Sequence, residues 1–330
     1  MTERAAEIRA FLAATSWAGA RRSALAGDAS ARRYERLQRT AGDSAVLMDA
    51  PPANNSPLRD FTRYAKHLRQ LDLSAPRIFA CDEPNGLMLL EDLGDALYSR
   101  EIPAGASEEQ LYGAAVDVLA HIHAHPAPSD TADLQTLMPD QAGLVYDFYA
   151  KSAENKPAFQ AVLETLLAQY STGTPVLCLR DYHADNLLWL PDRQGLVRVG
   201  LLDFQDAVLA HRSYDLVSLL YDARRDVPAS LAERMIRRYI TRTGQDADQF
   251  HIAAALNAAQ RQLRILGIFA RLARIFGKPQ YLQFMPRTWA HLTTSLSHPA
   301  LAPLRARVLA DLTPPDDTLM QRMSRPCPTP

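Results

Sequence analysis

Short apolar runs bounded by turn residues characterise the beginning of the chain. Five of these runs read as β-strands: residues 21–25, 33–38, 44–48, 77–81 and 87–91. Residues 58–71 lie between the third and fourth strands and keep one helix face apolar. A short helix over residues 5–14 precedes the first strand. We expect an antiparallel sheet with a helix against it, which is the small lobe of an α+β protein.

Apolar positions recur mainly at helical spacing beyond Leu93 and Gly94. The predicted helices cover residues 110–125, 162–170, 214–222, 230–243, 248–276 and 281–296. The proline-rich end of the chain predicts a loosely ordered tail. We therefore expect an N-lobe over residues 1–93, a mainly helical C-lobe over residues 94–313 and a tail over residues 314–330.

Three apolar runs within this helical part read as short buried strands: residues 175–179, 187–190 and 197–202. They flank Asp181, Asn186 and Asp203. A proton acceptor, a neutral metal ligand and an anionic metal ligand at this spacing are typical of phosphoryl transfer from a nucleotide. An isolated Asp-x-x-x-x-Asn is most often a chance match of turn residues. Arg180 directly before the first acid and the apolar flanks favour a kinase-like site.

Composition and charge narrow the class of protein. A chain of 330 residues that is 47% hydrophobic and 22% charged is ordinary for a soluble globular protein and long enough for two lobes. Its net charge of -1 argues against a nucleic-acid-binding surface. No apolar run reaches the length of a membrane span, and residues 1–14 lack the apolar middle of a signal peptide.

The cysteines indicate a cytoplasmic protein. Cys81, Cys178 and Cys327 are few, odd in number and without metal-type spacing, which favours free thiols in a reducing compartment. Nothing in the sequence indicates an obligate protein partner, and we expect a small molecule as the partner of the site.

With these motifs the chain resembles the aminoglycoside phosphotransferase and choline kinase group, over about residues 24–296. The resemblance implies a protein-kinase-like fold of two lobes that uses ATP and Mg²⁺. Asp181 would then orient the attacking hydroxyl, and Asn186 and Asp203 would hold magnesium against the nucleotide phosphates. Asp215 would brace the catalytic loop.

The same resemblance implies the nucleotide contacts. The Glu91 carbonyl and the Leu93 amide would pair with adenine at the hinge between the lobes. Residues 26–32 form a loop of small residues whose N–H groups and Ser30 hydroxyl could meet phosphate oxygens. An ordinary hairpin turn is the more frequent interpretation of such a loop.

A closer resemblance is to the bacterial cell-wall sugar kinases, which phosphorylate the anomeric hydroxyl of N-acetylmuramate and N-acetylglucosamine during peptidoglycan recycling. The segments that carry it are residues 27–30 with 33–34, 47–52, 90–94, and 266–271 with 277–282. It implies an amino sugar as the substrate. Two alternatives stay open. One is a kinase of another small hydroxyl acceptor (an aminoglycoside, choline or an amino-alcohol), and the other is a nucleotide-binding pseudokinase.

The chain departs from the wider fold because it lacks the usual lysine that binds the nucleotide phosphates. Met48 stands where a lysine is expected in the third strand, and no lysine lies between Met1 and Ala65. We hypothesise that Arg33 is the substitute, because a guanidinium can bond two phosphate oxygens at once.

Two groups of residues are candidates for contacts with the acceptor. His183 and Asp185 lie inside the catalytic loop and either bond sugar hydroxyls or are structural. A stretch without acids carries Arg261, Arg264, Arg271, Arg274 and Lys278. A solvated basic face is the usual explanation of such a stretch. The alternative is that one of these arginines contacts the lactyl carboxylate of N-acetylmuramate.

Overall fold

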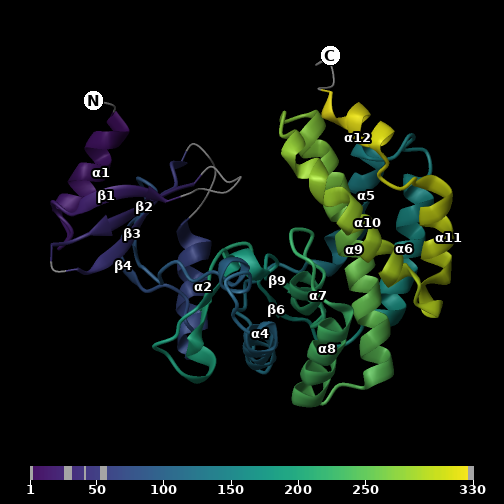
Figure 1. Cartoon of the computed structure of the whole chain (residues 1–330), viewed down its shortest axis with the longest axis horizontal. Coiled ribbons are helices and arrows are strands. Elements are labelled where there is room, and N and C mark those ends of the chain that lie inside the picture. Colours follow the sequence, from purple (N-terminus) through teal and green to yellow (C-terminus); the bar gives the residue numbers. More distant parts are fainter. Residues whose placement is uncertain (1–2, 26–31, 41, 53–57, 326–330) are drawn as a thin grey trace. The chain divides into compact units, whose positions relative to one another are not determined.

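The computed structural model describes residues 3–25, 32–40, 42–52 and 58–325. The chain forms two compact units, which are treated separately and called unit 1 and unit 2 (Figure 1). Unit 1 consists of Met1–Ala106 with Asp185–Asp206, and unit 2 of Ser107–Ala184 with Ala207–Pro330. The division into two units does not test the lobe boundary that we predict after residue 93, so that boundary stays a prediction.

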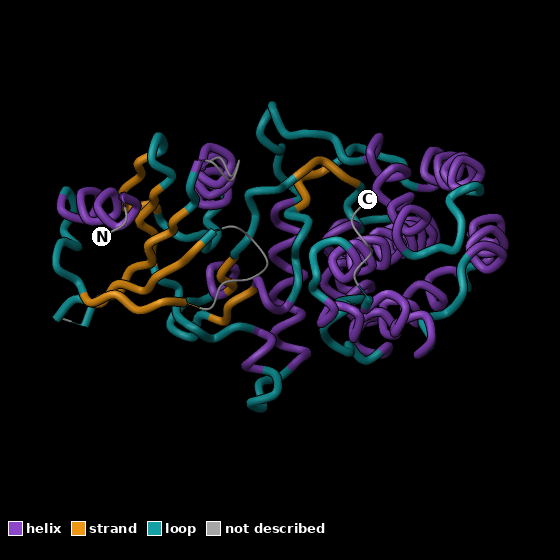
Figure 2. The backbone as a smooth tube through the Cα atoms, turned by 90° about the horizontal axis from the view of Figure 1, so that it is seen from above, coloured by secondary structure: helices purple, strands orange, loops and turns teal. Residues whose placement is uncertain are grey.

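Unit 1 is built on one antiparallel sheet. Its strands are β1 (Arg21–Leu25), β2 (Arg33–Gln38), β3 (Ser44–Asp49), β4 (Ile78–Asp82) and β5 (Leu87–Glu91). They pair in the order β1-β2-β3-β5-β4, and all neighbours are antiparallel. The strands are drawn in orange in Figure 2. The five predicted strands are thus confirmed, and together with the largely helical remainder they confirm the predicted α+β fold class.

The two faces of this sheet carry different side chains, because successive residues of a strand point to opposite faces. One face holds an apolar cluster with α1 (Glu3–Ala13). The strands contribute Leu37, Ala45, Leu47, Leu87 and Leu89 to this cluster, and α1 contributes Ile8 and Leu12. The alternate positions carry Tyr34, Arg36 and Met48, with Tyr34 directly opposite Met48. We call the first face the α1 face and the second the Tyr34 face.

A small hairpin from the middle of the chain also belongs to unit 1. It consists of β7 (Leu187–Trp189), the 3-10 turn η4 (Gly195–Arg198) and β8 (Val199–Leu201). Ser74, which follows α2 (Leu58–Gln70), fixes it: its hydroxyl donates to the Val197 carbonyl at 2.6 Å, and its carbonyl accepts from Leu201 N at 3.0 Å. These bonds hold Asn186 and Asp203, which flank the hairpin, within unit 1.

Unit 2 is mainly helical. Its longer helices are α4 (Glu108–Ile122), α5 (Met138–Phe148), α6 (Lys156–Tyr170), α7 (Tyr214–Leu220), α8 (Ala229–Thr243), α9 (Ala247–Arg274), α10 (Met285–Leu296), α11 (Ala302–Asp311) and α12 (Asp317–Ser324). Short strands β6 (Val176–Cys178) and β9 (Val208–Ala210) pair antiparallel. None of the described helices in either unit is long and apolar enough to span a membrane.

The end of the chain corrects one prediction. We expect residues 314–330 to be loosely ordered, yet α12 covers Asp317–Ser324. The Asp316 side chain caps this helix by accepting from Leu319 N at 2.7 Å, and Leu319 and Met323 are buried in the main apolar cluster of unit 2. Burial of these two side chains orders a segment that its prolines suggest is loose. Residues 326–330 lie outside the described part of the chain.

Helix α9 is the centre of the unit 2 core. It is buried on several sides and contacts α5, α6, α7 and α10. Its closest approach to α5 occurs at Gly267, where a Cβ would meet the Leu144 carbonyl carbon at 2.5 Å and Val145 N at 2.6 Å. A side chain at residue 267 would therefore force the backbones of α5 and α9 apart.

We predict that Gly267→Ala lowers the free energy of unfolding by about 1–3 kcal/mol, the usual cost of overpacking a core. Gly113→Ala in α4 is the matched control, since its nearest contact would be Arg238 Cζ at an ordinary 3.6 Å. That control should be neutral or slightly stabilising, because alanine favours a helix by up to about 1 kcal/mol over glycine. Urea unfolding of both variants measures the difference; equal effects would contradict the close packing of α5 and α9.

Candidate active site

The segment that carries Asp181 leaves β6 in a tight turn. Asp181 N donates to the Leu179 carbonyl at 2.9 Å, and Arg180 between them has φ 69°, in the left-handed region that non-glycine residues rarely adopt. Backbone strain of this kind costs of the order of 1–3 kcal/mol and persists only where the surroundings hold it.

Asp215, in the first turn of α7, holds this turn. Its carboxylate is fully buried and accepts hydrogen bonds from Leu179 N and from Arg180 N, the second at 2.9 Å. Ser218 Oγ also donates to the Arg180 carbonyl at 3.3 Å. Burial raises the pKa of Asp215 to about 7, although the two backbone N–H groups act in the opposite direction. These contacts support the predicted role of Asp215 as the brace of the catalytic loop.

Asp181 itself lies in a positively charged environment. Burial raises the pKa of Asp181, but the charges of nearby arginines, first of all Arg261 and then Arg264, lower it, and the pKa lies below its ordinary value. The carboxylate is therefore ionised at neutral pH and able to accept a proton. His183 is buried, and this burial lowers the pKa of its imidazole, so His183 is mainly neutral at pH 7.

Asn186 and Asp203 lie together in unit 1. Asn186 ends the 3-10 turn η3 (Ala184–Asn186), and its Nδ2 donates to Asp203 Oδ2 at 3.4 Å. Leu202 N donates to the Asn186 carbonyl at 3.0 Å, which ties the two segments. Asp203 has φ 56°, a second left-handed residue at the predicted site. A carboxylate beside a carboxamide oxygen fits Mg²⁺, which prefers oxygen ligands.

Tyr34 links the sheet of unit 1 to Asp203. Burial and the Asp203 carboxylate raise the pKa of the Tyr34 hydroxyl, whereas the guanidinium of Arg32, which is hydrogen-bonded to it, lowers that pKa. Arg32 is only 9% exposed. Arg32, which no sequence motif singles out, therefore lies on the Tyr34 face, where it and the charge of the predicted metal ligand Asp203 act on the same hydroxyl.

The position of Arg33 argues against our hypothesis for the missing lysine, which stays untested. Arg33 pairs with Asp49 and is exposed on the α1 face, where Asp49 is bonded to Arg4 of α1 at 2.9 Å. The alternation of β2 thus points Arg33 away from the face that carries Tyr34 and Met48. Ser30, the other predicted phosphate contact, lies outside the described residues.

The predicted adenine contacts lie at the end of β5 in unit 1. The Glu91 side chain is held by Arg193 Nη2 at 2.7 Å and by Arg77 N at 3.0 Å. Leu93 packs with Leu188 and Leu190 of the hairpin region. Because the expected adenine bonds use backbone atoms, the Glu91 and Leu93 side chains can form these structural contacts without affecting adenine binding.

Asp92, between these two residues, is fixed by the Tyr34 face of the sheet. Arg36 Nε donates to Asp92 Oδ2 at 2.7 Å, and Asp92 Oδ1 accepts from Gly94 N at 3.0 Å. The backbone that follows β5 therefore has a defined course. Asp185, the remaining candidate, lies in η3 and is half-buried in unit 1.

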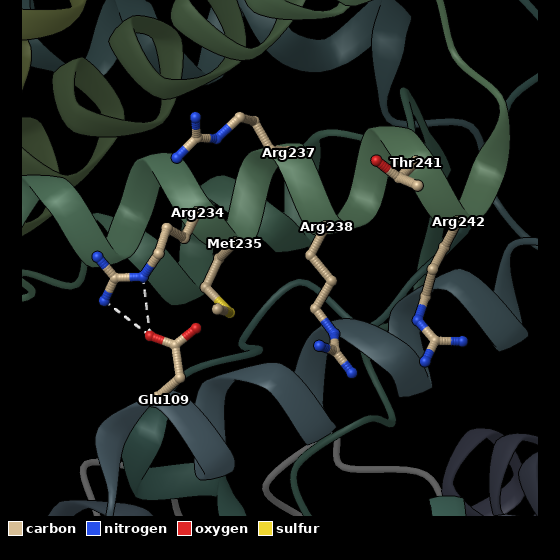
Figure 3. A pocket seen from close by; sticks show the side chains of 7 residues that line it. All are labelled: Glu109, Arg234, Met235, Arg237, Arg238, Thr241 and Arg242. Carbon is tan, nitrogen blue, oxygen red and sulfur yellow. Dashed lines mark hydrogen bonds and ion pairs between the residues drawn. The ribbon is translucent and has the colours of Figure 1, made fainter.

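A surface pocket in unit 2 is separate from all of these residues. It lies against α4 and α8, and its lining residues are Glu109, Arg234, Met235, Arg237, Arg238, Thr241 and Arg242 (Figure 3). Arg234 bonds Glu109 at 2.7 Å, and Arg238 bonds Asp117 at 2.7 Å. These arginines neutralise acids of α4, so the pocket is explained by helix packing and contains no predicted site residue.

The comparisons with known proteins agree with this geometry. A family model described as the phosphotransferase enzyme family matches residues 21–251. The chain belongs to the phosphotransferase enzyme family. An N-acetylmuramate/N-acetylglucosamine kinase of Caulobacter vibrioides is 40% identical to this phosphotransferase over 92% of this chain and 96% of that relative. A kinase of the same name from Pseudomonas putida is 33% identical over 88% of each chain.

Solved structures of similar fold are more distant in sequence. A choline/ethanolamine kinase family protein from Mesorhizobium loti has a TM-score of 0.66 at 16% identity, covering 92% of this chain and 99% of that one. The choline kinase LicA from Streptococcus pneumoniae has a TM-score of 0.61 at 13% identity, covering 92% and 100%. At such identities they show that this phosphotransferase shares their fold, as the sequence resemblance implies.

The raised pKa of the buried Asp215 predicts that the free energy of unfolding depends on pH. A folded-state pKa of about 7, raised from about 3.9 in the unfolded chain, means that protonation favours the folded state. Relative to Asp215→Asn, which cannot titrate, the wild type should lose free energy of unfolding as the pH rises from about 4 to 7. The loss should be at most about 4 kcal/mol and should level off above pH 7. Urea unfolding of both proteins between pH 4.5 and 8 measures it. A difference that does not vary with pH would contradict the buried, titrating carboxyl.

Proposed function

We propose that this phosphotransferase transfers the γ-phosphoryl group of ATP to the anomeric hydroxyl of N-acetylmuramate, N-acetylglucosamine or both. The observation that carries the proposal is the 40% identity, over 92% of the chain, to a kinase named for these two sugars. The ionised Asp181 of unit 2 and, by themselves, Asn186 and Asp203 of unit 1 are the residue types that phosphoryl transfer uses, and they support the proposal. The reaction would serve peptidoglycan recycling in the cytoplasm, where ATP and reduced thiols are present.

Asp181 is the proposed proton acceptor. Its ionised carboxylate would orient the attacking sugar hydroxyl and take its proton late in the transfer. An anomeric hydroxyl is more acidic than other sugar hydroxyls, so a carboxylate with a low pKa is a sufficient base. The rigid turn around Arg180, held by Asp215, would fix the direction of this carboxylate, and positioning supplies much of the catalysis in such reactions.

Asn186 and Asp203 are the proposed magnesium ligands, because their side chains meet in unit 1 and each carries an oxygen that can bind Mg²⁺. A bound Mg²⁺ would neutralise charge on the nucleotide phosphates. The Glu91 carbonyl and Leu93 amide are the proposed adenine contacts, and Ser30 a proposed phosphate contact. His183 and Asp185 remain proposed contacts of the sugar.

Two rival functions fit the residues less well. The solved neighbours include kinases of choline and ethanolamine, but the cationic choline would be repelled by the arginine charges that lower the pKa of Asp181. A pseudokinase has no need of an ionised acid at the catalytic position or of paired metal ligands. One set of assays distinguishes both alternative functions from the proposed one.

We predict product formation when magnesium and ATP are supplied with N-acetylmuramate or N-acetylglucosamine, and little with kanamycin or choline. Asp181→Asn should lower the turnover number about 1,000-fold, within the range of general-base effects, and leave ATP affinity nearly unchanged. Asp248→Asn, which removes an exposed acid at the start of α9, is the control with full activity. Coupled ADP release measures turnover, and calorimetry measures ATP binding.

If only choline or kanamycin is phosphorylated, the proposed sugar substrate is wrong. ATP binding without turnover on any acceptor would favour the pseudokinase. An Asp181→Asn enzyme that keeps more than about a tenth of the wild-type turnover would contradict the assignment of the base.

A further inference from the structure

Two arginines of α9 lie beside Asp181. Arg261 and Arg264 are three residues apart, so they share a helix face, and both lower the pKa of the Asp181 carboxyl. Arg261 is 6% exposed. Both also approach Tyr214: the Arg261 Cζ lies 5.7 Å from the ring centroid, and Arg264 Nη1 lies 3.4 Å from the hydroxyl. These contacts place two cations around one aromatic ring next to the proposed base.

The Arg261 guanidinium is satisfied only in part within the described residues. Among the residues that the structure describes, its buried Nε and Nη1 atoms have no hydrogen-bond partner. A buried cation without such partners carries a large desolvation cost, and the cost is tolerated at sites that receive an anion. Arg264 is half-buried, and desolvation lowers the pKa of its guanidinium. Arg261 therefore has donors available for a ligand, and Arg264 adds a second positive charge beside them.

The other basic residues of the stretch have different surroundings. Arg271 lies over the rings of Phe148 and Phe276, with Cζ 5.7 Å and 5.4 Å from their centroids. Arg274 Nη1 donates to the Phe148 carbonyl at 2.8 Å. The basic stretch seen in the sequence thus divides into a pair at Asp181 and residues that serve packing.

We propose that Arg261 and Arg264 form a carboxylate-binding site that recognises the lactyl group of N-acetylmuramate. This rests on the proposed function, because N-acetylmuramate differs from N-acetylglucosamine by the lactyl ether on O3, whose carboxylate is its one anionic group. A guanidinium presents a planar pair of donors that matches a carboxylate, and such charge-assisted bonds are strong. The ATP phosphates are the other available anion, but the proposed magnesium site of unit 1 already offers them a cation.

The test is the ratio of kcat/KM for N-acetylmuramate to that for N-acetylglucosamine. Arg264→Gln and Arg261→Gln should each lower this ratio roughly 10–100-fold, the range for one hydrogen bond to a charged group. The loss should lie mainly in the KM for N-acetylmuramate. Arg271→Gln, which removes an exposed cation of the same helix, should leave the ratio unchanged. Arg264→Gln decides the matter if the more buried Arg261 variant does not fold.

Equal losses on both sugars would overturn the carboxylate site. A raised KM for ATP with an unchanged ratio would also overturn it and identify the anion as a phosphate. Failure of the wild type to phosphorylate either sugar would instead reject the proposed function, so the two failures are distinguishable.

A separate observation identifies a cation on the nucleotide side. Arg32 directly precedes β2, is buried, and bonds the hydroxyl of Tyr34, which lies opposite Met48. Because Arg32 bonds Tyr34, it lies on the Tyr34 face together with Met48, which occupies the position of the expected lysine. The Tyr34 hydroxyl also senses the charge of Asp203, one of the proposed magnesium ligands.

We infer that Arg32 supplies the positive charge that a lysine in β3 would otherwise bring to the nucleotide phosphates. Its neighbour Arg33 points to the α1 face, which makes the two consecutive arginines a matched pair. Their substitution removes the same charge at adjacent positions at the start of β2 and differs in the face of the sheet.

Binding of magnesium-ATP and of adenosine is measured by calorimetry in the absence of any sugar. Arg32→Gln should weaken ATP binding roughly 10–100-fold and leave adenosine binding unchanged, since only ATP carries the phosphates. Arg33→Gln should bind both ligands as the wild type does. Wild-type ATP binding by Arg32→Gln, or an equal loss of adenosine binding, would overturn the inference, as would a comparable loss of ATP binding in Arg33→Gln.

Discussion

The hydrogen bonds from Leu179 N and Arg180 N to the buried Asp215 carboxylate are the contact on which the site depends. They hold a strained left-handed residue next to Asp181. Without them the segment after β6 would relax, because a left-handed conformation at Arg180 has no local compensation. The burial that makes this brace rigid also raises the pKa of Asp215, so the same carboxyl that orients the base couples the stability of unit 2 to pH.

Helix α9 combines scaffold and recognition. On one side Gly267 allows α5 to approach at backbone distance, and on another Arg261 and Arg264 surround Tyr214 beside Asp181. Two partly or fully buried cations are costly in an apolar core. Arg261 and Arg264 lie at a proposed sugar site and, within the described part of the chain, not in a structural ion pair. Binding of the sugar would therefore explain why the fold tolerates the desolvation cost of these cations. Their position also explains why the base next to them keeps a low pKa despite its burial.

The strands of unit 1 and the Asp181, Asn186 and Asp203 motif could be predicted from the sequence, because short alternating runs and a fixed spacing are local signals. Helix α5 was not predicted: Gly143 weakens its helical pattern, and its burial against α9 decides its form. Arg32 and Arg33 show the remaining limit. Which of two adjacent residues faces the phosphates depends on the phase of β2, and only its pairing with β3 and the burial of Leu37 fix that phase.

Identification of the product tests the central claim most directly. The wild-type enzyme is incubated with magnesium, ATP and N-acetylmuramate, and the product is examined by phosphorus and proton NMR. The account predicts a phosphorus nucleus coupled to the anomeric proton of the sugar, which defines a sugar 1-phosphate. A phosphate coupled to the protons at carbon 6, or no phosphorylated sugar while ATP still binds, would contradict it.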